Sequence, residues 1–163
     1  MSVKFVFKRN NETIIISDTK HSDILCLPDS SIMILDNGLI CGISESNNSG
    51  FYFLDYMKDI NDRFKGVLNK SFIVKNIVNH LQKYINKEPL WTEHPLYSLG
   101  CLYIIYGSSI FVILEDYSVV EINSYFCGDK KGATMYSVLK ELYNTEVSND
   151  YIINKLIFFL SKY

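Results

Sequence analysis

The order in which hydrophobic patterns follow one another constrains the fold of this chain more than any single motif. Patterns typical of strands come in two blocks, and patterns typical of helices, with apolar residues three and four apart, follow each block. The patterns predict strands at 3–8, 12–17, 32–36, 39–43, 98–106, 110–115 and 119–126, and helices at 47–66, at 71–86, after Gly128 and from Ser148 onward. Because strands and helices do not alternate one by one, we expect antiparallel sheets with the helices on their outer faces.

Short polar segments mark where the expected strands turn and where the expected helices begin. Asp36-Asn37-Gly38 separates two apolar runs and is a strong hairpin signal, because these residue types accept the positive φ angles of tight turns. Residues 9–12 form a second polar turn between the first two strands. Ser71 and Ser148 are the expected N-caps of the second and the last helix.

The apolar stripes of these elements predict how they pack. Two sheets packed face to face, with a pair of helices on each outer side, would bury every stripe. We therefore expect an α+β fold, a four-layer αββα sandwich with two antiparallel sheets. The length of 163 residues suits a single domain that spans 1–163.

Composition excludes several classes of function. The net charge is −2 and only two arginines are present, which argues against a nucleic-acid-binding surface. No apolar run is long enough to span a membrane. The four cysteines form no CxxC pair and the three histidines are scattered, so we expect no metal site and no cofactor. Cysteines in apolar runs are typical of buried free thiols, which favours a reduced, cytoplasmic location.

The last third of the chain carries the most specific resemblance to a known family. The segment LYIIYGSSIFVILEDYSVVEINSYFCGDKKGATMYSVLKELYNTEVSNDYIINKLIFFL resembles the closing pattern of proteasome β-subunits and HslV peptidases, and Asn144-Thr145-Glu146-Val147-Ser148 matches the family's NTELS-like link between two helices. TIIISDTK and SIMILDNGLICGISES resemble the family's earlier strands. The resemblance implies the N-terminal-nucleophile (Ntn) hydrolase fold and assembly of subunits into rings.

The same resemblance implies a catalytic set. The family's nucleophile is the first residue of the mature chain, so Ser2 would be the nucleophile after removal of Met1, with its own α-amine as the base. Asp18 corresponds to the family's acidic residue, and Gly42 to the glycine whose N–H helps to form the oxyanion hole. Each also has an ordinary structural interpretation. Ser2 would start a strand, Asp18 would be a turn residue, and Gly42 would be a close-packing or bulge glycine.

Three departures from the family pattern weaken the catalytic interpretation. The family has a lysine at the start of its third strand, but residues 29–33 contain none. Asp129, in the loop at 127–132, replaces a family serine, and serine replaces threonine as the candidate nucleophile. We therefore favour a non-catalytic subunit that acts through protein binding or self-association as a homo-oligomer. The alternative is an active peptidase that uses Ser2.

Overall fold

The computed structural model describes residues 3–17, 31–44, 48–85, 100–127 and 133–161, and all structural statements concern these residues. The strands are β1 (Val3–Arg9), β2 (Glu12–Ser17), β3 (Ile32–Ile34), β4 (Ile40–Ile43), β5 (Leu102–Tyr106), β6 (Ser109–Ile113), β7 (Val119–Glu121) and β8 (Tyr125–Cys127). The helices are α1 (Asn48–Asn61), α2 (Lys70–Ile73), the π-helix η1 (Val74–Val78), α3 (Asn79–Ile85), α5 (Ala133–Tyr143) and α6 (Asn149–Leu160). None of these helices is long and apolar enough to cross a membrane.

The strands form two antiparallel sheets, as expected for an α+β fold. One sheet has the order β2-β1-β8 and the other the order β3-β4-β5-β6-β7. The strand range predicted at 119–126, for which a division into two strands was left open, holds two strands, because the chain changes sheets there. The Ile122 N–H donates to Ile110 O at 2.8 Å in the larger sheet, whereas Ser124 O accepts from the Lys8 N–H at 2.7 Å in the smaller one.

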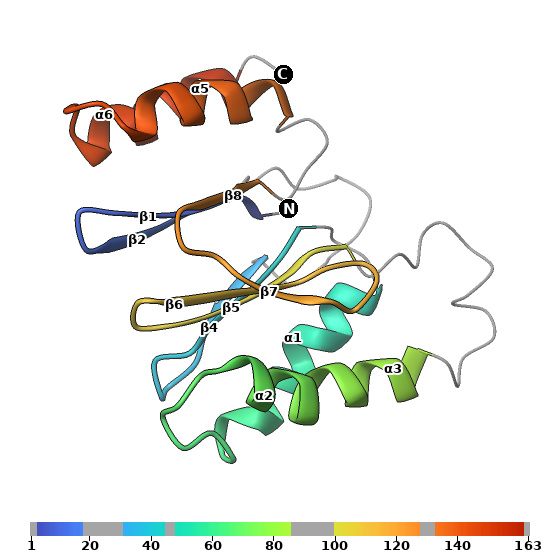
Figure 1. Cartoon of the computed structure of the whole chain (residues 1–163). Helices are drawn as coiled ribbons and strands as arrows, with labels where there is room; N and C mark the ends of the chain where they lie inside the picture. The colour runs from blue at the N-terminus through green and yellow to red at the C-terminus, as the bar shows by residue number, and fades with distance from the viewer. Residues whose placement is uncertain (1–2, 18–30, 45–47, 86–99, 128–132, 162–163) are drawn as a thin grey trace.

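Helices cover the outer faces of both sheets (Figure 1). Helices α5 and α6 lie over the three-stranded sheet, and α1, α2 and α3 lie under the five-stranded sheet. The side chains of β1 alternate between two of the resulting cores: Phe5 and Phe7 pack with Leu139, Ile152 and Leu156 of α5 and α6. Val6, on the other face, packs with residues of the five-stranded sheet. The two faces of β1 thus join the upper helices to the larger sheet.

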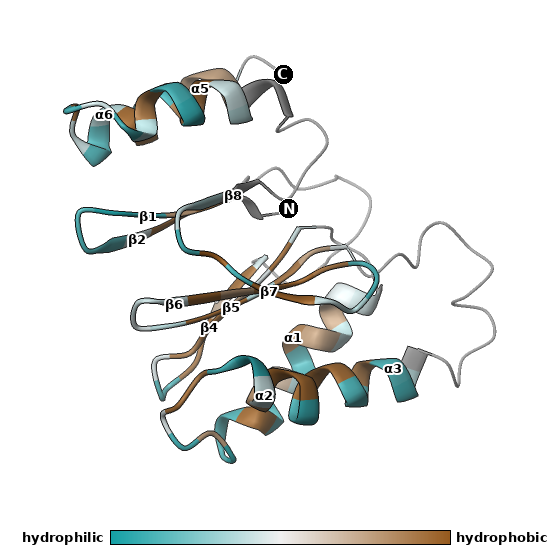
Figure 2. Ribbon diagram, viewed as in Figure 1, coloured by the Kyte–Doolittle hydropathy of each residue, from teal (hydrophilic) through white to brown (hydrophobic). Residues whose placement is uncertain are grey.

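A third and larger core lies between the five-stranded sheet and the lower helices. It combines Leu39, Cys41 and Ile43 of the β4 region with buried residues of α1 and of the α2–α3 helices. Figure 2 shows the apolar colours concentrated in β4, β5 and β6, and polar residues recurring along α3. The i, i+4, i+8 residues Ile73, Ile77 and Leu81 are fully buried, which confirms the apolar face expected for this helix.

The two predicted hairpin turns are confirmed. In the β1–β2 turn, Asn10 and Asn11 have φ angles of 53° and 62°, the left-handed conformation that a tight two-residue hairpin requires. In the β3–β4 turn, Gly38 has a φ of 86°, and Asn37 Oδ1 accepts from the Leu39 N–H at 3.0 Å. Asn37 therefore closes the turn with its side chain, as Asx turns do.

One helix cap was predicted correctly and one was not. Ser148 caps α6, because its Oγ accepts from the Tyr151 N–H at 3.2 Å. Ser71 does not cap α2; the cap is Asn69, whose extended backbone lets its Oδ1 accept from the Phe72 N–H at 2.9 Å. Ser71 already lies inside the first turn of the helix. Helix α1 also ends at Asn61, before the predicted end near Gly66.

The Cys41 thiol provides a test of the core between the larger sheet and the lower helices. Cys41 is fully buried, and burial raises its pKa to about 12. Because only the thiolate is nucleophilic, we expect iodoacetamide to leave Cys41 unmodified in the native protein at mildly alkaline pH and to modify it after unfolding in urea. Peptide mass spectrometry resolves Cys41 from the other cysteines. Modification of native Cys41 as fast as in urea would contradict this packing.

Candidate functional site

The structure describes one of the three candidate catalytic residues. Ser2 and Asp18 lie outside the described residues, as does Asp129. Val3 and Ser17, their neighbours in the sequence, are paired across β1 and β2. In the sequence, Ser2 immediately precedes and Asp18 immediately follows one residue of this pair. Gly42 is described, and it is buried in β4.

Gly42 lies between two neighbouring strands, opposite Ile32 of β3 and Tyr103 of β5. Two hydrogen bonds set the alternation along β4: the Ile43 N–H donates to Ser31 O at 2.9 Å, and the Ser44 N–H donates to Cys101 O at 2.8 Å. Backbone groups of successive residues in an antiparallel ladder point to opposite neighbours. The alternation therefore directs the N–H of Gly42 toward Tyr103 in β5, as part of the sheet.

Gly42 also leaves space beside a large buried side chain. Residues directly opposite each other in a sheet share a face, so the row Ile32, Gly42, Tyr103, Val112 and Val120 lies on the face that meets the smaller sheet. Tyr103 is 1% exposed and belongs to the core between the sheets. A glycine beside a buried aromatic ring fits the close-packing interpretation of Gly42.

A buried serine lies just before β3, in the segment where the resemblance led us to look for a lysine. Ser31 precedes Ile32, is 2% exposed, and its Oγ has no hydrogen-bond partner within the described structure. Its backbone oxygen accepts from the Ile43 N–H. The described residues 31–44 contain no lysine that could lower the pKa of a nearby amine.

The hydroxyl at the end of β4 has a structural role. Ser44 is buried, and its Oγ accepts from the Cys101 N–H at 2.7 Å. Its own N–H donates to Cys101 O. The side chain thus replaces the last backbone acceptor of the β4–β5 ladder at the point where β4 ends.

Comparison with solved structures gives a clear fold assignment. The crystal structure of eukaryotic HslV from Trypanosoma brucei superimposes with a TM-score of 0.66 at 10% sequence identity, over 96% of this chain and 88% of HslV. The chain has the HslV fold. The structure of Thiobacillus denitrificans BPH in complex with epoxomicin is also similar, with a TM-score of 0.62 at 14% identity, over 95% of this chain and 86% of BPH. No protein-family model matches the sequence, and no curated protein matches it.

A cluster of stacked aromatic side chains lies between the lower helices of this HslV fold. This cluster was not predicted from the sequence. Tyr52 and Tyr56 of α1 interleave with His80 and Tyr84 of α3 in a seam of nearly parallel rings. Ring centroids are 3.5 Å apart for Tyr52 and Tyr84, and 3.7 Å apart for Tyr56 and His80. Tyr52 Oη lies 2.6 Å from His80 Nε2. The i, i+4 spacing of aromatic residues in two predicted helices was the available signal.

The aromatic seam also stabilises the π-helix. Tyr56 donates its hydroxyl hydrogen to Asn76 O at 2.8 Å, within η1. The Asn76 side-chain amide donates to Phe72 O at 2.9 Å, one turn earlier. A π-helix widens the helical turn and disturbs the regular i to i−4 bonds, so these side chains supply bonds in the widened segment. The seam therefore ties α1 to η1 as well as to α3.

The His80 imidazole makes the stability of the seam depend on pH. Burial, together with Arg63, lowers the pKa of His80 below its usual value of 6.5, while Asp59 opposes the shift and Lys83 adds to it. The His80 imidazole therefore binds a proton less tightly in the folded state than in the unfolded state. The stability from neutral His80 is present above pH 6.5 and is lost as the pH falls through the lowered pKa.

We expect the urea midpoint of the wild-type protein to fall as the pH is lowered from about 7 to about 5, with a smaller fall in His80→Phe. Phenylalanine keeps an aromatic ring beside Tyr56 but cannot titrate. The difference between the two proteins isolates His80 from the other histidines. An equal fall in both proteins would show that His80 does not carry this dependence.

No cluster of three or more histidine, cysteine, aspartate or glutamate side chains that could hold a metal ion occurs within the described ranges. Nor do the candidate groups around Gly42 converge on one reacting point, since the described hydroxyl of Ser44 and the N–H of Gly42 serve the sheet. Of the predicted catalytic residues, Gly42 alone is described, and its N–H lies in the ladder between β4 and β5.

Proposed function

We propose that this protein is a non-catalytic HslV/proteasome-like subunit that acts through protein binding or self-association. The observation that carries the proposal is the ladder position of Gly42. An oxyanion donor must point at the developing charge of the substrate, whereas the ladder alternation directs this N–H toward Tyr103 within the sheet. Gly42 thus supports packing between the sheets rather than binding of an oxyanion.

The region at the start of β3 supports the same proposal. An N-terminal amine must be largely unprotonated to act as a base, and its usual pKa of about 7.7–8.0 is lowered by a nearby ammonium group. Ser31 lies at the start of β3, and no lysine occurs in 31–44. A chain with Ser2 as nucleophile would lack this assistance from β3.

The arrangement of the layers fits the proposed type of subunit. We infer that the helices and sheets form the four-layer αββα sandwich of the Ntn hydrolases, in which the two sheets pack on each other between helix layers. The separate cores above, between and below the sheets support this inference. Subunits of the related family assemble into rings, and we propose self-association of this chain in the cytoplasm on that basis.

The second candidate function is an N-terminal-nucleophile peptidase that uses Ser2 after removal of Met1. Two observations favour it. The pair Val3 and Ser17 brings the strand ends next to Ser2 and Asp18 together. The fold is also similar to that of BPH, whose structure is a complex with epoxomicin. If Ser2 is active, the oxyanion donor must come from a residue other than Gly42.

Intact-mass analysis with epoxomicin separates the two candidates. We expect the protein purified from its natural source to gain no mass after incubation with epoxomicin, even in molecules that have lost Met1. An adduct that forms on the wild-type protein and on Ser108→Ala, but not on Ser2→Ala, would refute the non-catalytic proposal. Ser108 lies in the exposed β5–β6 turn, so its variant is a control for loss of a hydroxyl. Native mass spectrometry of the same sample reports the number of subunits.

A further inference from the structure

We propose that Tyr52 and Tyr84 form a site of oxidative cross-linking, at which a one-electron oxidant of phenols joins the two rings as a dityrosine. The two residues belong to different helices, so the new bond links α1 to α3 covalently. His80 accepts the phenolic proton of Tyr52 during the reaction. The site is separate from Gly42, because the aromatic seam packs beneath the larger sheet and Gly42 faces the smaller sheet.

The rings of Tyr52 and Tyr84 are in contact before any reaction. Their centroids lie 3.5 Å apart, and their planes differ by only 8°. Two parallel rings at this distance touch through carbon atoms over the whole area in which they overlap. Radical coupling of tyrosines forms a bond between the ring carbons next to the hydroxyl groups. Because the rings are held together, this bond needs only a small movement, and coupling gains the speed of an intramolecular reaction.

Tyr52 has a proton acceptor beside its hydroxyl group. Tyr52 Oη lies 2.6 Å from His80 Nε2. A phenol is a stronger acid than a neutral imidazole, so Tyr52 donates this hydrogen bond and Nε2 accepts it. Burial, which is the largest cause, and Arg63 lower the pKa of His80. The imidazole is therefore neutral at pH 7 and able to accept a proton.

The histidine makes Tyr52 easier to oxidise than a tyrosine whose hydroxyl group faces water. Removal of an electron from a phenol turns its hydroxyl into a strong acid, so the electron leaves more readily when a positioned base takes the proton. Tyr52 and Tyr84 are only half-buried, so a small oxidant reaches the edge of the stack from solvent. The electron and the proton of Tyr52 thus have separate acceptors, the oxidant and His80.

The cross-link removes two electrons and two protons in total. Tyr52 and Tyr84 each give one electron to one equivalent of oxidant; Tyr52 passes its phenolic proton to His80, and Tyr84 releases its own to water. A carbon–carbon bond then forms between the two rings. The hydrogens on the bonded carbons leave as protons, while both oxygens regain a proton, that of Tyr52 from His80. The imidazole is therefore unchanged at the end, and the protein has lost two hydrogen atoms.

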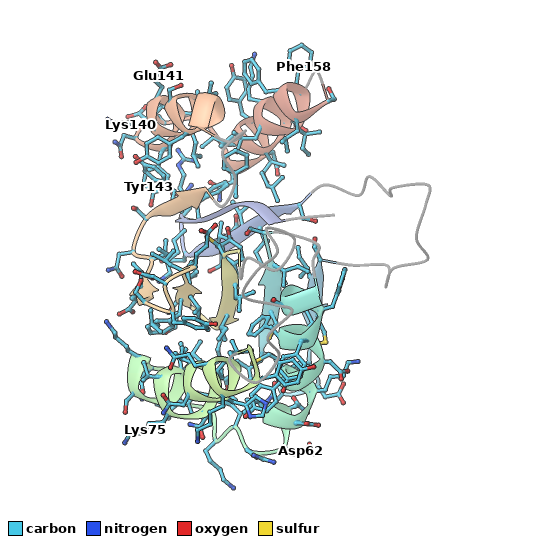
Figure 3. All side chains as sticks on the ribbon, turned by 90° about the vertical axis from the view of Figure 1, so that its right-hand side faces the viewer. Asp62, Lys75, Lys140, Glu141, Tyr143 and Phe158 are labelled. Atoms are coloured by element: carbon cyan, nitrogen blue, oxygen red, sulfur yellow. The ribbon has the colours of Figure 1, made fainter. Side chains whose placement is uncertain are left out.

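A second group of tyrosines provides an internal comparison. The ring centroid of Tyr125 lies 5.3 Å from that of Tyr136 and 5.0 Å from that of Tyr143, with the planes tilted by 55° and 54°. Residues 100–161 contain no histidine. Figure 3 shows Tyr143 at the upper helices and Lys75 at the lower helices, so the two groups of tyrosines are far apart. Among the described residues, the Tyr125 pairs therefore have neither the parallel ring contact nor a neighbouring imidazole.

Photochemical oxidation of the wild-type protein tests the site. Tris(bipyridine)ruthenium(III), generated by light and persulfate in dilute protein solution, is the one-electron oxidant. We expect individual chains to lose two hydrogen atoms, with the link between Tyr52 and Tyr84 formed at least about tenfold faster than any link from Tyr125. Trypsin cleaves after Lys83, so Tyr84 begins its own peptide, and fragmentation of the linked peptides distinguishes Tyr52 from Tyr56.

Two variants separate the role of the ring contact from that of the imidazole. His80→Phe keeps an aromatic ring beside Tyr56 but accepts no proton, so the link between Tyr52 and Tyr84 should form at least about tenfold more slowly, while the links from Tyr125 keep their rate. Tyr84→Phe should abolish the link to Tyr52. The purified cross-linked protein should have a higher urea midpoint, because the bond restricts the unfolded chain between residues 52 and 84.

Three results would overturn the proposed site. These are a link from Tyr125 that forms as fast as that from Tyr52, a His80→Phe variant that cross-links at the wild-type rate, and a cross-linked protein whose urea midpoint is unchanged. The first comparison is made within the wild-type protein, so it decides the matter even if His80→Phe does not fold. A Ser2-dependent epoxomicin adduct would refute the proposed function and leave this cross-linking site standing.

Discussion

Replacement of Tyr103 by alanine should lower the free energy of unfolding by about 4 kcal/mol, the typical cost of removing a fully buried aromatic side chain. Tyr103 is 1% exposed and lies in the core between the two sheets. On its own sheet it has Gly42 on one side and Val112 on the other. Because Gly42 has no side chain, nothing on that side can fill the space that the ring leaves.

The loss should appear as a lower urea midpoint with an unchanged m-value, measured by circular dichroism. Val120→Ala is the matched control, because Val120 occupies the same row of the same sheet face but is 39% exposed. We expect that variant to lose less than about 1 kcal/mol. If Tyr103→Ala lost no more than Val120→Ala, the two sheets would not pack over Tyr103, and the packing role of Gly42 would be wrong.

The strands and hairpins were predictable because their signals are local. Asn10-Asn11 and Asn37-Gly38 accept the backbone angles that tight turns require, and each lies between apolar runs. The faces of β1 were less predictable, because Phe5, Val6 and Phe7 are all apolar and all buried. A strand buried on both sides shows no alternation that assigns one face to the helices and the other to the second sheet.

The change of sheet between β7 and β8 was not predictable from a continuous run of strand-forming residues. It depends on the backbone hydrogen bonds: the Ile122 N–H donates to Ile110 in the larger sheet, whereas Ser124 O accepts from Lys8 in the smaller sheet. The cap at Asn69 was missed for a similar reason, since Ser71 is also a good capping residue and only the backbone conformation decides between them.

The candidate site was predictable only as a set of positions. A resemblance can place Gly42 on a strand, but the direction of its N–H depends on the hydrogen-bond alternation of β4 with two neighbours. The aromatic seam was hidden because Tyr52 and His80 belong to different helices, 28 residues apart. Their contact follows from how α1 and α3 pack, which one sequence does not specify.

Replacement of Arg9 by alanine should lower the free energy of unfolding by about 3 kcal/mol, because one side chain joins the β1–β2 hairpin to the link between α5 and α6. Arg9 Nε donates to Tyr143 O at 3.1 Å, and its Nη1 donates to Asn149 Oδ1 at 2.9 Å. Its Nη2 donates to Thr145 O. The guanidinium therefore satisfies one carbonyl group in the last residue of α5 and one just after it, and fixes the side chain of Asn149 at the start of α6.

The neighbouring bonds explain why the loss should exceed that of an ordinary surface residue. Tyr143 donates its hydroxyl hydrogen to Lys8 O, and Asn149 donates to Glu12 Oε2 at 2.6 Å. Two of the three partners of Arg9, Tyr143 and Asn149, thus also bind the hairpin directly, and removal of the guanidinium leaves part-buried acceptors without their donor. Bonds from charged donors are stronger than neutral ones, which raises the cost.

Two variants make the Arg9 prediction specific to the geometry of the guanidinium. Arg9→Lys keeps the charge but cannot make three bonds from a planar group, so we expect it to lose more than about half of the effect of alanine. Arg63→Ala removes the other arginine of the chain, which is exposed in the turn after α1, and should change stability by less than about 0.5 kcal/mol. Urea denaturation measures all three. A lysine variant as stable as the wild type would mean that charge alone, and not the three directed bonds, holds the α5–α6 link on the hairpin.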